Sequence, residues 1–478
     1  MQTSLEKKYG LFTAICLVVG IVVGSGVFFK AQTILEKTNG NLTLGIIAWI
    51  VGGAVMLSCI TSFAFMATKY EKVNGFVDYA EALVSPRYGY YVGWFALTIY
   101  YPGMTSVLVW LSARYILVFI ASAFPSVQFV IPAAEGGTAI GPECFALSLF
   151  ILVASYAVNT LSPKLAGKLQ VSTTVIKLIP LLLMAVVGII VGIFSKEATL
   201  IQNFNAPSSS EGHPLFAAVV ATAFAYEGWI LATVINSELK DAKRNLPKAL
   251  FIGAIIIIAI YLFYYIGVAG GAPISVLIKD GATVAFTNIF GRGFGAILNL
   301  FVAISCIGTV NGLMLTMTRG MYSLAARGQG PYPKVFAEVS ECTGMPMSSS
   351  VVGLFIVAFW FIYYYFSNLA AFPWLGLFSF DSAELPIITI YAFYIPIFIN
   401  FMKKSTDFGF FKRFFVPTLS IIGSVFMCFA ALYAHGIEPF LKARSEGYFT
   451  FPVLFYLIIF AIIMGIGAIL ERRRNKAV

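Results

Sequence analysis

Residues 21–29 read IVVGSGVFF, and two glycines in this stretch interrupt an apolar run that begins at residue 11. A helix needs about twenty apolar residues to cross a bilayer. Glycine restrains the backbone poorly, so Gly24 and Gly26 weaken the helix near its middle. No convincing cleavage pattern follows the run, as it would in a signal peptide. The stretch therefore predicts a retained first membrane span whose helix is broken at the glycines.

The composition of the whole chain excludes a water-soluble fold. Of the 478 residues, 59% are hydrophobic and only 11% are charged, whereas about 25% of the residues of soluble proteins are charged. Apolar segments long enough to cross a bilayer recur along the chain. We predict an all-α membrane protein with twelve transmembrane helices. After the first, they lie near residues 43–68, 88–121, 143–160, 165–195, 214–237, 247–270, 293–326, 348–366, 372–401, 414–436 and 449–470.

The net charge of +10 is explained by membrane topology and needs no nucleic acid partner. Lysines and arginines gather in short loops between the apolar runs, for example at 240–244, 403–404 and 472–474. Such loops face the cytoplasm in membrane proteins. We therefore expect both termini to be cytoplasmic, in a multi-pass protein of the cell membrane that is embedded in the lipid bilayer.

The sequence offers no metal site and no catalytic cluster. Its two histidines, His213 and His435, and its six scattered cysteines do not have metal-ligand spacing. The spans carry no set of acid, base and nucleophile, and no repeated ring of charges or carbonyls that a channel would need. We predict no metal, no cofactor and no enzyme activity, and we disfavour a membrane-embedded enzyme or a channel.

A second interruption lies in the sixth span, at Tyr226-Glu227-Gly228. Spans 1 and 6 are five spans apart, and interrupted helices at corresponding places in two halves are typical of inverted repeats with a substrate site between them. The sequence thus predicts two five-span repeats, at 1–195 and 196–401, followed by spans 11 and 12 with a cytoplasmic tail at 402–478. In this arrangement helices 1 and 6 are both broken.

The two breaks together can bind a zwitterion. Backbone N–H groups at the start of the outer half of span 1, helped by the helix dipole, suit a carboxylate. Backbone carbonyls left free at the breaks suit an ammonium group; they belong to Val22, Val23, Phe224 and Ala225. This pattern indicates an amino acid site. The alternative is that Gly24 and Gly26 only allow close helix packing.

Four sequence blocks, in order, resemble the amino acid–polyamine–organocation superfamily, especially its L-type amino acid transporter branch. They are GSGVF at 24–28, FAYEGW at 224–229, NSELK with RNLP at 236–247, and SCIGTVNG at 305–312 followed by Arg319, Tyr322, Arg327-Gly328 and Pro331. The resemblance implies the leucine-transporter-like fold and secondary active transport of L-amino acids by alternating access. Within the branch it favours a sodium-independent exchanger of neutral amino acids.

The resemblance also implies which residues bind the substrate. The carboxylate would lie on the backbone at Ser25, Gly26 and Val27, and the amine would meet carbonyls at Val22, Phe224 and Glu227. Phe224 would act as an aromatic lid, although a lone phenylalanine in a span more often only packs. Glu227 stands where the branch usually has Asp or Gly, and could line the pocket or brace the unwound backbone. The predicted substrate-binding set is Val22, Gly24, Ser25, Gly26, Val27, Phe224, Ala225, Tyr226 and Glu227.

Lys177 is a cation in the middle of span 5. Burying a charge there is costly, so a functional role is favoured over a lysine that reaches the membrane surface. A lysine matches this position in the L-type branch, and by resemblance its ammonium stands where sodium binds in related symporters. We therefore expect Lys177 to bridge spans 1, 5 and 8 in place of a coupling ion.

Lys30 and Asp381 are expected to form an outer gate. In sodium symporters of this architecture, a basic residue one turn beyond the break in span 1 pairs with an aspartate of span 10. The alternative is that Lys30 reaches the headgroups and Asp381 pairs with Arg114. The roles of Arg114 and Glu384 stay open.

Two further expectations concern a partner subunit and coupling. The loop between spans 3 and 4 has only Cys144, beside span 4 rather than in mid-loop. By resemblance to the heavy-chain-linked animal transporters, this argues against a heavy-chain partner and favours a single-subunit carrier of a bacterial inner membrane. The carboxylates of Glu227, Asp381 and Glu384 keep a second hypothesis open, a proton-coupled or cationic amino acid or polyamine carrier.

Overall fold

The computed structural model describes residues 10–69, 75–124, 126–127, 141–206, 214–230, 239–369 and 379–477. Within these residues, ten helical segments are long and apolar enough to cross a membrane. They are Leu42–Ala67, Pro86–Ala123, Pro142–Leu161, Pro163–Phe194, Lys243–Gly271, Arg292–Ala325, Met347–Ser367, Glu384–Lys404, Phe411–Ser445 and Pro452–Arg472. Ten of the twelve predicted spans correspond to these segments. The other two, the first and the sixth, are interrupted.

The chain before the sixth span forms the following helices. They are α1 (Leu11–Val22), α2 (Gly26–Lys37), α3 (Leu42–Ala67), α4 (Phe76–Leu83), α5 (Pro86–Phe95), α6 (Tyr101–Ala123), α7 (Pro142–Leu161), α8 (Pro163–Leu183), α9 (Ile189–Phe194) and α10 (Thr199–Phe204). A π-helical turn, Ala96–Tyr100, joins α5 to α6, and another, Met184–Gly188, joins α8 to α9. Prolines occupy the first turn of α5, α7 and α8, where their missing N–H has no helical partner to lose.

The remaining helices begin with the sixth span. They are α11 (Pro214–Tyr226), α12 (Ala242–Gly271), α13 (Ile274–Asp280), α14 (Ala282–Phe290), α15 (Arg292–Thr318), α16 (Gly320–Ala325), α17 (Pro333–Phe336), α18 (Met347–Tyr364), α20 (Glu384–Lys404), α21 (Val416–Leu432), α22 (Glu438–Ser445) and α23 (Pro452–Ala477). Three more π-helical turns, Tyr365–Leu369, Phe411–Phe415 and Tyr433–Ile437, extend α18, precede α21 and follow α21.

The outer faces of these helices expose apolar side chains, as a lipid environment requires. On α8, Val171, Val175 and Ile179 follow one another at four-residue spacing and are 60%, 61% and 45% exposed. Lysine or glutamate would occupy such a stripe in a soluble helix. The exposed apolar stripe and the polar interior contacts described below identify a multi-pass membrane protein.

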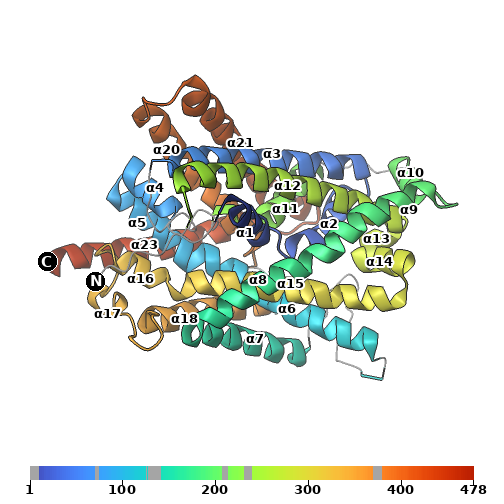
Figure 1. Ribbon diagram of the computed structural model, residues 1–478, viewed down its shortest axis with the longest axis horizontal. Helices are drawn as coiled ribbons and strands as arrows, with labels where there is room; N and C mark the ends of the chain where they lie inside the picture. The colour runs from blue at the N-terminus through green and yellow to red at the C-terminus, as the bar shows by residue number, and fades with distance from the viewer. Residues whose placement is uncertain are drawn as a thin grey trace.

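Short helices form the centre of the molecule. Figure 1 shows α1, α2 and α11 in the middle, with α3 and α12 along one side and α6, α8 and α15 along the other. The segment that contains α6 and the π-helical turn before it is more deeply buried than the C-terminal α23. The two interrupted spans and the helices next to them therefore lie in the interior of the bundle.

Candidate functional site

The first span is broken at the predicted glycines. Helix α1 ends at Val22 and α2 begins at Gly26, so the residues between them are not helical. The sixth span breaks as well: α11 ends at Tyr226, and Gly228 has a φ of +103°, a conformation that glycine adopts without steric cost. The motif residues 236–238, which follow this break, lie outside the described residues.

The two breaks lie directly against each other. A Cβ added to Gly26 would lie 2.9 Å from the Cα of Ala225 and 3.1 Å from Cδ1 of Phe224. A Cβ added to Gly24 would lie 3.1 Å from Oγ1 of Thr309, a residue of α15. Gly26 therefore allows α2 to approach the backbone of α11. This glycine lies at the break in the helix and also permits close packing, so both roles considered for it apply.

The start of α2 presents donors to the buried centre. The first N–H groups of any helix have no partner within it, and here Ser25, Gly26 and Val27 are all buried. The hydroxyl of Ser25 makes no hydrogen bond to a nitrogen or oxygen of the described residues. A buried hydroxyl beside a helix N-terminus is a suitable binding partner for a carboxylate.

The carbonyls at the breaks share one unexpected partner, Tyr261 of α12. Its hydroxyl oxygen lies 3.0 Å from the carbonyl oxygen of Val22 and 2.9 Å from that of Ala225. A hydroxyl has a single proton and can fully satisfy only one of them. The sequence did not single out Tyr261, because in the run IIIIAIYLFYY it looks like any packing aromatic of a span.

Replacing Tyr261 by phenylalanine is expected to lower transport severalfold. Removing one partner of a buried hydrogen bond costs about 1–3 kcal/mol, and here it also removes the link between the two breaks. Tyr265→Phe is the matched control on the same helix, because the Tyr265 hydroxyl is buried without a hydrogen-bond partner among the described residues. Uptake by the two variants in proteoliposomes is the measurement, and equal rates would contradict the role of Tyr261.

Glu227 contacts its own backbone and span 3. Its carboxylate accepts a hydrogen bond from the Tyr100 hydroxyl and another from the N–H of Gly228. Tyr100 ends the π-helical turn Ala96–Tyr100. Irregular turns of this kind are frequent at functional sites. Of the two roles considered for Glu227, these contacts favour bracing the unwound backbone.

Lys177 lies inside the protein and contacts span 1. Its side chain is fully buried, and its Nζ donates a hydrogen bond to the carbonyl oxygen of Gly20 at 2.6 Å. Helix α15 of the eighth span packs against α8, which carries Lys177. Lys177 thus touches the end of α1 one turn before the break.

The gate residues are paired differently from the prediction. Among the described residues, no salt bridge joins Lys30 to Asp381, and none joins Asp381 to Arg114. Lys30 instead pairs with Glu384, whose role the sequence left open. The short Asp381 side chain accepts the N–H groups of Ala383 and Glu384, at 2.9 and 2.6 Å, and so caps the start of α20.

Arg114 lies beside aromatic rings, and none of the salt bridges among the described residues involves it. Its guanidinium carbon lies 5.5 Å from the ring centre of Trp110 and 5.7 Å from that of Tyr115. Distances of this size are typical of cation–π interactions, which accommodate a cation without a carboxylate.

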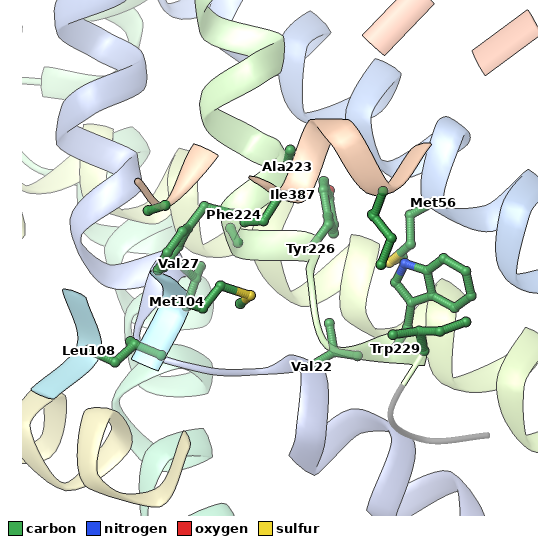
Figure 2. Close-up of a cluster of buried hydrophobic side chains, with 14 of the residues drawn as sticks. Val22, Val27, Met56, Met104, Leu108, Ala223, Phe224, Tyr226, Trp229 and Ile387 are labelled. Atoms are coloured by element: carbon green, nitrogen blue, oxygen red, sulfur yellow. The ribbon is translucent and has the colours of Figure 1, made fainter. Parts of the chain in front are cut away.

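Phe224 packs between the break and the cation of Lys30. Its ring centre lies 5.4 Å from that of Phe29 and 5.4 Å from Nζ of Lys30. Figure 2 shows the apolar side chains gathered around the breaks, among them Val27, Met104 and Phe224. The predicted lid is thus linked through Lys30 to Glu384.

Comparison with known proteins identifies the family of this chain. The amino acid permease family model matches residues 9–464. The serine/threonine exchanger SteT of Bacillus subtilis (strain 168) is 27% identical over 439 residues, which cover 89% of this chain and 91% of the relative. The Asc-type amino acid transporter 1 of Mus musculus is 28% identical over 350 residues, and the large neutral amino acids transporter small subunit 2 of Homo sapiens is 26% identical over 349.

The match to the two mammalian relatives is partial. It covers 72% of this chain in both cases, and 63% and 62% of the relatives' own length. The family model, in contrast, spans nearly the whole chain. The protein belongs to the amino acid permease family, within the amino acid–polyamine–organocation superfamily. It is a multi-pass membrane transporter.

Proposed function

We propose that the protein exchanges neutral L-amino acids across the cell membrane, independently of sodium and by alternating access. The contact between the two broken spans carries this proposal. It brings the N-terminus of α2 close to the carbonyl groups of Val22 and Ala225, which share the Tyr261 hydroxyl, inside the protein. Such a place offers donors to a carboxylate and acceptors to an ammonium group. SteT is named as a serine/threonine exchanger, which supports exchange of a small neutral substrate.

We also infer the wider architecture from the position of the breaks. The two interrupted segments are spans 1 and 6, and together with the ten continuous segments they give twelve transmembrane helices. The repeats are residues 1–195 and 196–401, related by inversion, and residues 402–478 add two spans and a tail. Both termini face the cytoplasm, so that α2 belongs to the outer half of span 1. A bacterial inner membrane is the proposed location.

The transporter works as a single subunit in this proposal. Cys144 is the cysteine nearest to the loop between spans 3 and 4, and its side chain is buried at the start of α7. A buried thiol cannot form a disulfide with a second chain without local opening. This supports a carrier without a disulfide-linked heavy chain.

Substrate recognition should require both the α-amine and the α-carboxylate. Because backbone groups at the breaks bind each of them, losing either leaves buried polar groups unpaired, at a cost of about 1–3 kcal/mol. The experiment measures inhibition of labelled serine uptake in proteoliposomes by serine, by serine amide and by the deaminated hydroxy acid. Serine should compete, and the two analogues should be about tenfold weaker or worse. Strong inhibition by either analogue would contradict this mode of binding.

A second candidate is a proton-coupled or cationic substrate carrier. The observation that favours it is the buried carboxyl of Glu227 next to the breaks. Ionisable groups inside membrane proteins often belong to proton pathways. Accumulation of amino acid driven by an imposed pH gradient, without amino acid inside the vesicles, would establish this candidate against exchange.

A further inference from the structure

Glu384 lies between two bases that come from different spans. One carboxylate oxygen pairs with Nζ of Lys30 on α2, and the other lies 3.1 Å from Nε2 of His435, in the π-helical turn Tyr433–Ile437. The side chains of Lys30, Glu384 and His435 are 9%, 9% and 19% exposed. The cluster thus joins span 1 to spans 10 and 11, next to the aromatic ring of Phe224.

The charge of this cluster depends on one proton. An ionised carboxylate only accepts hydrogen bonds, so Nε2 of His435 carries a proton towards Glu384. Neutral histidine can supply that proton. The charges of Lys30 and Glu384 then cancel, and the cluster of Lys30, Glu384 and His435 has no net charge. A second proton on Nδ1 makes the cluster positive by one unit. A net charge is costly in a place so poorly exposed to water.

Several elements with titratable side chains surround His435. The elements that pack against its turn are α11, α21, α22 and α23. Up to residue 472, beyond which the structure does not describe the side chains of α23, the titratable side chains of these elements are Tyr226, Cys428, Glu438, Lys442, Arg444, Tyr456, Glu471 and Arg472, and Tyr433 belongs to the turn itself. Within the described residues, the only ion pair of His435 is with Glu384. A proton on His435 therefore acts on the Lys30–Glu384 pair first.

We propose that His435 is a proton-binding site that controls the outer half of span 1. When His435 takes up a proton, its imidazolium replaces Lys30 as the partner of Glu384. Lys30, on its flexible side chain, then moves to water, and the buried part of the cluster is neutral again. Because Lys30 also lies over the rings of Phe29 and Phe224, its release loosens the packing of α2 against α11. In the orientation and alternating-access cycle proposed above, acid on the outer side thereby favours the state that is open to the outside.

The proposal concerns the state of α2 and does not depend on which substrate is carried. It is tested without substrate, by hydrogen–deuterium exchange of the purified protein in lipid nanodiscs. Peptides from Gly26–Lys37 are followed at pH 7.5 and pH 5.5, with labelling times scaled to the intrinsic exchange rate at each pH. Wild type should exchange about fivefold faster at pH 5.5 after this scaling, because local opening governs exchange.

Three variants decide the outcome. His435→Gln keeps an N–H donor for Glu384 but cannot take up a proton, so its α2 should exchange equally at both pH values. Lys30→Met removes the group to be released and should also abolish the response, which keeps the test decisive if the first variant does not fold. Glu438→Gln, three residues from His435, is the matched control and should respond like wild type. No response in wild type, or an unchanged response in His435→Gln or Lys30→Met, would overturn the proposal.

Discussion

Lys177→Ala is expected to slow transport about 100-fold or more while the protein stays folded. The side chain is fully buried, and its ammonium donates to the carbonyl of Gly20 at the end of α1. A hydrogen bond from a charged group contributes about 1.5–3 kcal/mol, and here it holds the end of α1 in position beside the break. Exchange of labelled serine in proteoliposomes is the measurement, with thermal unfolding of the purified variant to establish folding.

Lys168→Ala is the matched control for Lys177→Ala. Lys168 lies on the same helix but is exposed, so its loss should leave exchange near the wild-type rate. If the ammonium of Lys177 takes the place of a coupling ion, wild type should also be indifferent to replacement of sodium by choline. A collapse of wild-type uptake in choline would rule out that role for Lys177.

Gly26→Ala should weaken substrate binding and transport by about 5- to 150-fold. The new Cβ would lie 2.9 Å from the Cα of Ala225, which is backbone and cannot turn aside as a side chain would. Overpacking of this kind costs about 1–3 kcal/mol, and the strain falls where α2 meets α11. The apparent KM and the maximal rate of exchange are both measured, because displaced donors at the start of α2 should raise KM.

Gly465→Ala provides the comparison for Gly26→Ala. A Cβ at this glycine of α23 would have no atom within 4 Å, so the change should be neutral or slightly stabilising in a helix. If Gly26→Ala transports as well as Gly465→Ala, the close approach of the two breaks does not matter for function.

The sequence by itself determined the class of the protein, the position of the break in span 1 and the burial of Lys177. These features are local: apolar runs require a bilayer, glycine weakens a helix wherever it stands, and a cation in mid-span must turn inward. The family motifs then pointed to an amino acid permease. None of these conclusions depends on how the helices are rotated relative to one another.

Only the tertiary structure decided which side chains meet at the site. Glu384, not Asp381, pairs with Lys30, because the short Asp381 carboxylate caps α20 while Glu384 extends from its first turn. Tyr261 joins the two breaks across 239 and 36 residues of sequence. Such partners depend on the rotation and tilt of each packed helix, and sequence spacing does not specify these, since a rotation of one residue (about 100°) presents a different face.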